Sequence, residues 1–381
     1  MKILVISDLP HFVVGGAEMQ AARLVKAWIQ DGHEVICLGR RMGASQVDIG
    51  GSSIQVRRIW TVQSFGRAGR AISYFLSLSL LLWRYRRWAD VIYCRFLGDG
   101  AATAAICKQL GLLKTPLVAT PANAGPHGDL SYLRSVPGYR LLVRLIDRQV
   151  NAVNLIAPKM EQDLRDAGLE RARISKIPNG IEIEEIRRTR GADKLKLISV
   201  GRLATQKGYD VLIDALAMAP LTVESLQISV LGDGPEAESL KRRAEQLPKG
   251  LLEFEGEKDV TVVRRRLLAS DLFVLPSRYE GMSNAGLEAM ECGLPLVITE
   301  CGGLDQFLDS SMGWVVPAND PSALSEVLAK LSIASRETLL EMGSNCRGRA
   351  EELFSMREVS RRYIALFEEV CRENCGRRTE L

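Results

Sequence analysis

Residues 2–38 read KILVISDLPHFVVGGAEMQAARLVKAWIQDGHEVICL, and this stretch decides the fold class. Residues 2–7 contain four consecutive apolar side chains, at 3–6, which is typical of a strand buried on both faces. Between residues 17 and 30 the apolar side chains recur with the spacing of one helix face, and Gly32 is well placed to end that helix. Residues 33–38 then read as a second strand. The segment therefore predicts two parallel strands joined by a crossover helix.

The same alternation continues along the chain and restarts after residue 194. Further strands are expected at residues 54–60, 91–94, 117–120 and 153–156, and then at 195–201, 226–231, 252–255, 272–275, 296–299 and 314–316. A chain of 381 residues is long for a single hydrophobic core, so we expect two α/β domains. The polar stretch at residues 179–194 is the expected linker, which gives domains at 1–182 and 183–356. The last helices are expected at about 336–353 and 357–374.

Composition excludes several classes of protein. Apolar residues make up 46% and charged residues 25% of the chain, which is ordinary for a globular protein, and a net charge of +4 does not indicate a nucleic-acid partner. The eight cysteines include no CxxC pair, so we interpret them as reduced thiols in a cytoplasmic protein. The longest apolar run, residues 71–83, is too short to cross a bilayer as a helix.

In parallel α/β sheets, ligands bind at the loops that follow the strands. The first such loop ends in Gly15 and Gly16, directly before the predicted helix. Glycines there allow backbone N–H groups to approach a phosphate, although a tight turn is the alternative interpretation. The glycine spacing matches neither GxGxxG nor GxxxxGK[ST], which counts against a dehydrogenase or a P-loop NTPase.

A second loop, after the strand at 195–201, carries Arg202 and Lys207. The two cations could converge on one diphosphate, or they could be solvated surface charges.

A third loop, after the strand at 272–275, carries Glu280 and then a helix start at Ser283 or Asn284. The backbone amides from Ser283 to Ala285 would form a second anion site. Glu288 lies one turn into that helix. Because a carboxylate repels phosphate, Glu280 and Glu288 are better suited to accept hydrogen bonds from sugar and ribose hydroxyls.

Together these motifs resemble the GT-B-fold retaining glycosyltransferases of family 4, also called glycosyl transferases group 1. The resemblance runs through residues 2–7 with Gly15 and Gly16, DGHEV at 31–35, PNGI at 178–181, GRL at 201–203 with Lys207 and Gly208, GDGP at 232–235, and the segment from Pro276 to Glu288. It implies two Rossmann-like domains with parallel sheets that face a central crevice. It also implies that a final helix, about 357–381, returns to the N-terminal, acceptor-side domain, while the C-terminal domain binds the donor.

The resemblance also implies roles for individual residues. Arg202 and Lys207 would hold the diphosphate of a UDP- or GDP-linked sugar, and Glu280 would bind a hydroxyl of that sugar. The amides of Ser283, Asn284 and Ala285 would hold phosphate, Glu288 would bind the ribose, and Gly15 and Gly16 would line the donor site from the first domain.

The implied reaction is hexosyl transfer with retention to a saccharide or lipid-linked acceptor, without a metal or other cofactor. Its setting would be surface polysaccharide or glycolipid synthesis, in the cytoplasm or at the inner face of the membrane. A sugar-nucleotide epimerase of related fold would need acid and base groups that the sequence does not offer. A non-catalytic nucleotide-sugar binder is the other alternative.

The chain departs from the family pattern after the strand at 117–120, where a histidine that contacts the donor sugar is often found. Here residues 121–127 read PANAGPH, so Asn123 and His127 become the candidates on the acceptor side, with His127 as a catalytic candidate. A serine that the family places before the next helix is replaced by Ala157.

One further stretch is basic and aromatic. Residues 49–89 contain no acidic residue, and they contain seven arginines, at 57, 58, 67, 70, 84, 86 and 87. Tryptophan, tyrosine and phenylalanine are interleaved with them. A buried helix with a charged end would explain this pattern, and so would a peripheral surface for anionic lipid or a lipid-diphosphate acceptor.

Overall fold

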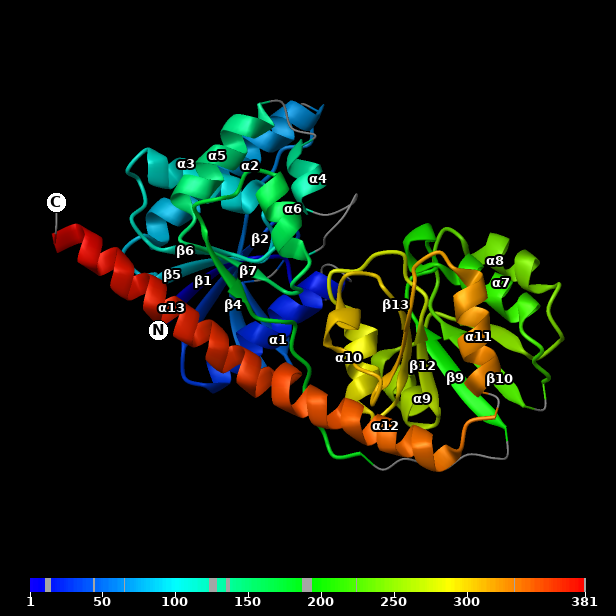
Figure 1. Cartoon of the computed structure of the whole chain (residues 1–381). Helices are drawn as coiled ribbons and strands as arrows, with labels where there is room; N and C mark the ends of the chain where they lie inside the picture. The colour runs from blue at the N-terminus through cyan, green and yellow to red at the C-terminus, as the bar shows by residue number, and fades with distance from the viewer. Residues whose placement is uncertain are drawn as a thin grey trace. The chain divides into compact units, whose positions relative to one another are not determined.

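The computed structural model describes residues 1–10, 15–43, 45–64, 66–122, 129–134, 138–186, 194–223, 225–331 and 333–379. The chain divides into two compact units (Figure 1). Unit 1 consists of Met1–Gly180 and Met356–Leu381, and unit 2 consists of Ile181–Ser355. The boundary expected between residues 182 and 183 lies two residues beyond this division.

Unit 1 is built on an eight-stranded sheet in the order β3-β4-β2-β1-β5-β6-β7-β8. Its strands are β1 (Lys2–Ile6), β2 (Glu34–Gly39), β3 (Gln46–Ile49), β4 (Ser52–Arg58), β5 (Val91–Cys94), β6 (Leu117–Ala119), β7 (Ala152–Leu155) and β8 (Arg173–Lys176). Its helices are α1 (Gly16–Gln30), α2 (Gly66–Tyr85), α3 (Asp99–Gln109), α4 (Asp129–Arg134), α5 (Tyr139–Gln149), α6 (Met160–Asp166) and α13 (Met356–Thr379). All neighbouring strands are parallel except β3 and β4.

Unit 2 is built on a six-stranded parallel sheet in the order β11-β10-β9-β12-β13-β14. The strands are β9 (Leu195–Val200), β10 (Leu226–Leu231), β11 (Leu252–Gly256), β12 (Leu272–Leu275), β13 (Leu296–Thr299) and β14 (Gly313–Val316). The helices are η1 (Thr205–Lys207), α7 (Tyr209–Met218), α8 (Ala237–Ala244), α9 (Val260–Leu268), α10 (Asn284–Glu291), η2 (Leu304–Phe307), α11 (Pro321–Leu331), α12 (Arg336–Arg349) and the π-helical turn η3 (Ala350–Phe354). Two Rossmann-like α/β units are therefore present, as the strand pattern predicted.

Helix α13 completes the core of unit 1, which confirms the expected return of the last helix to the first domain. Its apolar side chains join the cluster formed by β1, β2, β5 and α1, and α13 packs beside α1 (Figure 1). Trp28 lies at the centre, with ring centroids 5.4 Å from Tyr93, 6.0 Å from Tyr363 and 5.4 Å from Phe367 in edge-to-face arrangements. These aromatic contacts hold residues that are more than 300 positions apart in one core.

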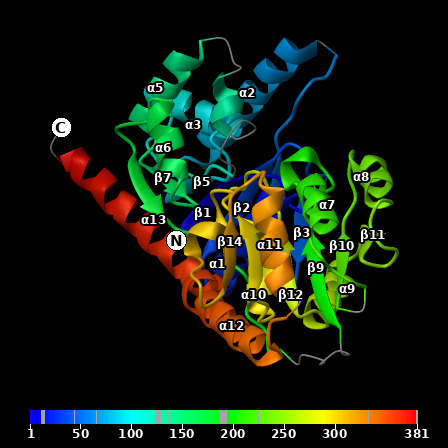
Figure 2. The same cartoon turned by 45° about the vertical axis from the view of Figure 1, so that its right-hand side comes forward.

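Helix α2 corresponds to the basic and aromatic stretch, and it is longer than the apolar run at 71–83. Leu78 and Leu82 are its fully buried side chains, and α2 packs beside α3 (Figure 2). Several large apolar side chains of α2 are exposed instead. The interpretation of residues 71–83 as a buried helix with a charged end is therefore wrong, because one side of α2 is exposed.

None of the described helices is both long enough and apolar enough to cross a membrane.

The cysteines give a prediction about reactivity. Six thiols are buried, Cys371 is half-buried with its pKa raised to about 11 by burial, and Cys375 is exposed. We expect Ellman's reagent at pH 8 to modify Cys375 quickly and Cys371 slowly, since the thiolate is the reactive form. The other six should react only after unfolding in guanidinium chloride. Cys375→Ser should remove the fast phase, and rapid reaction of three or more thiols in the native protein would contradict this burial pattern.

Candidate active site

The loop after β9 and the loop after β12 come into close contact in unit 2, and Gly208 makes this possible. Gly208 has φ +64°, and a Cβ atom there would lie 2.0 Å from the carbonyl oxygen of Pro276. A side chain is therefore excluded both by the left-handed backbone and by the neighbouring loop. The helical segment between Thr205 and Met218 is consequently divided into η1 and α7 at this glycine.

Hydrogen bonds join the same two loops. The Arg278 amide donates to the Gln206 carbonyl at 2.8 Å, and Gln206 Nε2 donates to the Tyr279 carbonyl at 3.1 Å. The Arg278 guanidinium also binds both carboxylate oxygens of Asp210, at 2.9 and 2.7 Å. Burial alone would raise the pKa of Asp210, but the hydrogen bonds and charge of Arg278 outweigh it and lower that pKa. These contacts fix the backbone around Lys207 and Glu280.

Lys207 and Glu280 form an ion pair at the junction of the two loops. Glu280 is only 6% exposed, and the oxygen that binds Lys207 Nζ also accepts a hydrogen bond from Ser277 Oγ at 2.8 Å. The Glu280 amide donates to the Cys301 carbonyl at 2.9 Å, which adds the loop after β13 to the cluster. Lys207 is therefore no solvated surface cation, and Glu280 is a positioned carboxylate with its charge balanced.

Helix α10 begins beside this cluster, with Ser283 as its N-cap. Ser283 Oγ accepts a hydrogen bond from the Gly286 amide at 3.2 Å, which decides between the two N-cap candidates. Asn284 and Ala285 form the first turn and are half-buried, as is Glu288 one turn later. The N-terminal end of α10 carries the partial positive charge of the helix dipole and suits an anion.

Two more glycine-dependent contacts shape the same edge of the sheet. A Cβ atom on Gly232 would lie 2.0 Å from the Gly201 carbonyl oxygen, and one on Gly303 would lie 2.6 Å from the Gly281 carbonyl oxygen. The GDGP segment thus packs against the start of the loop that carries Arg202, and the loop after β13 packs against the start of the α10 loop. Arg202 itself is exposed on its loop.

Not every predicted residue can be assigned to this cluster. The Lys207 ammonium is directed to Glu280, and no contact joins it to Arg202 in the described structure. Gly15 and Gly16 lie at the start of α1 in unit 1, where Glu18 is close to Gly15. Asn123 and His127 lie outside the described residues.

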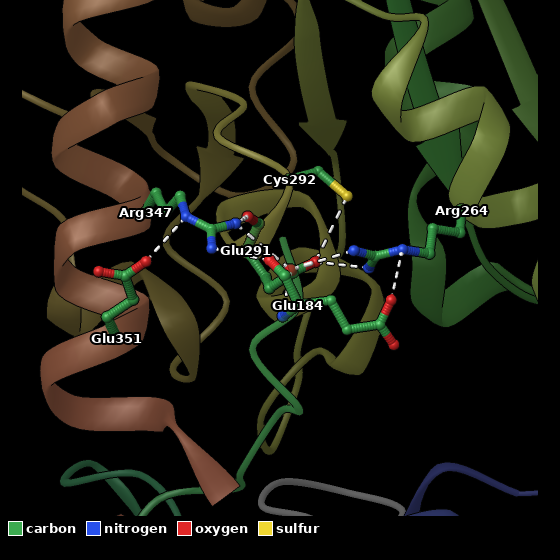
Figure 3. A network of polar contacts seen from close by, with 6 residues as sticks. All are labelled: Glu184, Arg264, Glu291, Cys292, Arg347 and Glu351. Atoms are coloured by element: carbon green, nitrogen blue, oxygen red, sulfur yellow. Dashed lines mark hydrogen bonds and ion pairs between the residues drawn. The ribbon is translucent and has the colours of Figure 1, made fainter. Parts of the chain in front are cut away.

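Sequence reasoning missed the residues that support α10 from its other end. Glu291, the last residue of α10, is fully buried and forms ion pairs with Arg264 of α9 at 2.6 Å and Arg347 of α12 at 3.4 Å (Figure 3). One of its carboxylate oxygens also accepts a hydrogen bond from the Glu184 amide at 3.1 Å. The two arginines lie 27 and 56 positions from Glu291 in the sequence, so no local pattern predicts these ion pairs.

The two arginines also hold Glu184, in the segment that opens unit 2. Arg264 Nε lies 3.2 Å from a Glu184 carboxylate oxygen, and Arg347 donates to the Glu184 carbonyl at 2.8 Å (Figure 3). The hydrogen bonds and charge of Glu291 raise the pKa of Arg264. The network therefore ties α9, α10, α12 and the first residues of unit 2 to one buried carboxylate.

Comparisons with known proteins agree with this architecture. Residues 14–185 match Glycosyltransferase Family 4, and residues 182–349 match Glycosyl transferases group 1. The chain is 28% identical over 295 residues to the putative colanic acid biosynthesis glycosyltransferase WcaL of Salmonella typhimurium. The matched segment covers 74% of this chain and 71% of that protein. It is 25% identical over 251 residues to a GDP-mannose-dependent monoacylated alpha-(1-6)-phosphatidylinositol monomannoside mannosyltransferase of Corynebacterium glutamicum. This match covers 61% of this chain and 64% of that protein.

Among solved structures, Anabaena HepE in complex with UDP-glucose superposes with a TM-score of 0.74 and 19% identity, over 97% of this chain and 100% of that one. The likeness shows the fold. The chain is therefore a glycosyltransferase with the GT-B fold, in which a Glycosyltransferase Family 4 region is followed by a Glycosyl transferases group 1 region.

Proposed function

We propose that this glycosyltransferase takes a sugar from a UDP- or GDP-linked donor bound in unit 2 and transfers it, with retention, to a saccharide or lipid-linked acceptor. The proposed setting is surface polysaccharide or glycolipid synthesis. The observation that carries the proposal is the cluster of Lys207, Glu280 and Ser277 beside the N-terminal end of α10. It combines a cation, an oriented carboxylate and an anion-binding helix end in one place.

The donor diphosphate would bind to the amides of Asn284 and Ala285 and to Lys207 and Arg202. Lys207 can contact the phosphate while it keeps its pair with Glu280, because an ammonium group has three N–H donors. This positive charge would stabilise the departing diphosphate without a metal ion. Glu288, further along α10, would accept hydrogen bonds from the ribose hydroxyls.

Glu280 would hold the donor sugar rather than attack it. One of its oxygens already accepts hydrogen bonds from Ser277 and Lys207, so the carboxylate is held in a fixed orientation and can accept another bond from a sugar hydroxyl. In the proposed step the bond from the sugar to the diphosphate breaks, and the acceptor oxygen bonds to the same face of the sugar. The acceptor proton passes to the departing phosphate oxygen.

The acceptor would bind in unit 1. A cavity of about 300 Å³ lies at the ends of β1, β2 and β5, and its polar lining includes Asp8, Arg40, Tyr74 and Asp99. Carboxylate, guanidinium and phenol groups together suit a ligand rich in hydroxyl groups. The names of the relatives support both kinds of setting, since one is a colanic acid glycosyltransferase and the other acts on a phosphatidylinositol mannoside.

A thermal-shift panel followed by a release assay tests this proposal. The panel would contain UDP-glucose, UDP-galactose, UDP-N-acetylglucosamine, GDP-mannose, UDP and GDP, each with and without EDTA. We expect one base series to stabilise the protein, EDTA to have no effect, and nucleotide diphosphate to be released when acceptor extract is added. Binding without release would favour a non-catalytic binder, and interconversion of sugars without release would favour an epimerase. No shift with any of these compounds would contradict the donor site.

A further inference from the structure

Helix α2 carries apolar side chains on two opposite sides. Leu78 and Leu82 face the core of unit 1, whereas Ile72, Leu76 and Leu80 are 61%, 61% and 65% exposed. The exposed residues recur every fourth position, so they form one stripe along the helix. A helix that is apolar on all sides is normally covered on all sides, and here one side is open to solvent.

Neighbouring residues widen this stripe. Trp83 is half exposed one turn further along α2. The segment before the helix runs beside it, because the Trp60 amide donates to Ser77 Oγ at 2.8 Å and the Val62 amide donates to Ser73 Oγ at 2.9 Å. The Trp60 side chain is 69% exposed. We call the set Trp60, Val62, Ile72, Leu76, Leu80 and Trp83 the α2 apolar face.

The segment that carries the α2 apolar face has charges of one sign only. Residues 49–89 contain seven arginines and no acidic residue or lysine, and Arg70, Arg84 and Arg87 are exposed. Arg86 is different, because its guanidinium stacks over the Trp83 ring at 4.1 Å and donates to the Trp83 carbonyl. Arg86 therefore orients Trp83, and the other three arginines remain as charges for an external partner.

We propose that the α2 apolar face is a docking surface for an anionic lipid bilayer. Leucine and isoleucine side chains would enter the acyl boundary, the two tryptophans would lie at the headgroup level, and Arg84 and Arg87 would contact lipid phosphates. Charge selects this occupant, because arginines at the edge of an apolar stripe, without any carboxylate between them, complement a negative surface. The docking would be peripheral and would not depend on the donor chemistry of unit 2.

Vesicle flotation with the purified full chain tests the proposal. The probes are vesicles of phosphatidylcholine alone and of phosphatidylcholine mixed with phosphatidylglycerol, at low and high salt. We expect binding to the mixed vesicles, little binding to phosphatidylcholine, and weaker binding at high salt. The charge variant Arg84→Glu with Arg87→Glu should lower the partition coefficient more than tenfold, since each basic side chain near an anionic surface contributes roughly a factor of five.

Two further double variants separate the contribution of the apolar side chains from that of the arginines and from a general effect of charge. Leu76→Gln with Leu80→Gln changes exposed residues only, so it should fold normally and also lower binding about tenfold or more. The matched control, Arg242→Glu with Arg265→Glu, makes the same charge change at exposed positions of unit 2 and should bind almost as well as the unmodified protein. Melting curves for all variants would verify that each is folded.

Three results would overturn the proposal. One is equal binding to neutral and anionic vesicles, and another is full binding by the Arg84 and Arg87 charge variant. The third is a dimer, detected by analytical ultracentrifugation in the absence of lipid, that Leu76→Gln with Leu80→Gln dissociates, because the face would then be covered by a second copy of the chain.

Discussion

Replacing Glu280 by glutamine is expected to lower the turnover of the nucleotide sugar by about 10²–10³-fold, while free UDP or GDP still binds. The glutamine keeps the size of the side chain and can still accept a hydrogen bond from Ser277, but it loses the charge that orients the donor sugar. Glu280→Ala should have a larger effect, because it also removes the acceptor.

The direction of the change in nucleotide affinity distinguishes two roles for Glu280. The native carboxylate balances the charge of Lys207, so its removal makes the site more positive. If Glu280 serves the sugar, the free nucleotide diphosphate should bind Glu280→Gln at least as tightly as it binds the unmodified enzyme. Isothermal titration with UDP and GDP would measure this.

Glu253→Gln is the matched control, because Glu253 is exposed on β11 of the same unit. It should retain normal turnover and normal binding. Turnover by Glu280→Gln at the level of the control would contradict the assigned role. If nucleotide affinity is lost together with turnover, Glu280 maintains the conformation of the loop and does not bind the donor sugar.

Replacing Glu291 by alanine is expected to lower the free energy of unfolding of unit 2 by about 3 kcal/mol. The change leaves Arg264 and Arg347 without their buried partner and the Glu184 amide without its acceptor. We place the effect at the lower end of the usual range because the two arginine side chains are 28% and 20% exposed and keep some contact with water. For a unit of this size the corresponding fall in melting temperature is roughly 6–12 °C.

Glu351→Ala supplies the control for this change. Glu351 also binds Arg347, at 2.8 Å, but it is half exposed and lies four residues away on the same helical segment. Its removal should cost at most about 0.5 kcal/mol. Circular dichroism during thermal unfolding would compare the two variants, and equal melting temperatures would show that the buried network does not stabilise unit 2.

The strands of both sheets were largely predictable because parallel strands are buried on both faces and appear as apolar runs. Two strands were missed for different reasons. β8 has no fully buried residue, so it lacks such a run. β3 pairs with β4 through Gly50 and Gly51, both with positive φ, and this two-glycine hairpin was a signal that the sequence contained.

The candidate site was predictable only where one loop carries several functional groups. Glu280, Ser283 and Glu288 lie close together in the sequence, so their common helix start was evident. The pairing of Lys207 with Glu280 depends on how two loops meet. Tertiary contacts of Gly208 and Arg278 bring these loops together. The sequence does not decide between the two roles of α2, because spacing alone indicates the stripes of a helix but not which stripe is covered.

The packing of α13 against α1 and β5 also sets an order in which the two units can complete folding during synthesis on the ribosome. Unit 2 is continuous, so all its residues have been translated when Ser355 is added, whereas unit 1 begins first and still lacks Tyr363 and Phe367. Trp28 and Tyr93 therefore gain these aromatic partners only after unit 2 has been translated. Unit 1 begins to emerge before unit 2 but can complete its core only after it, which reverses the usual N-terminal-first order of folding.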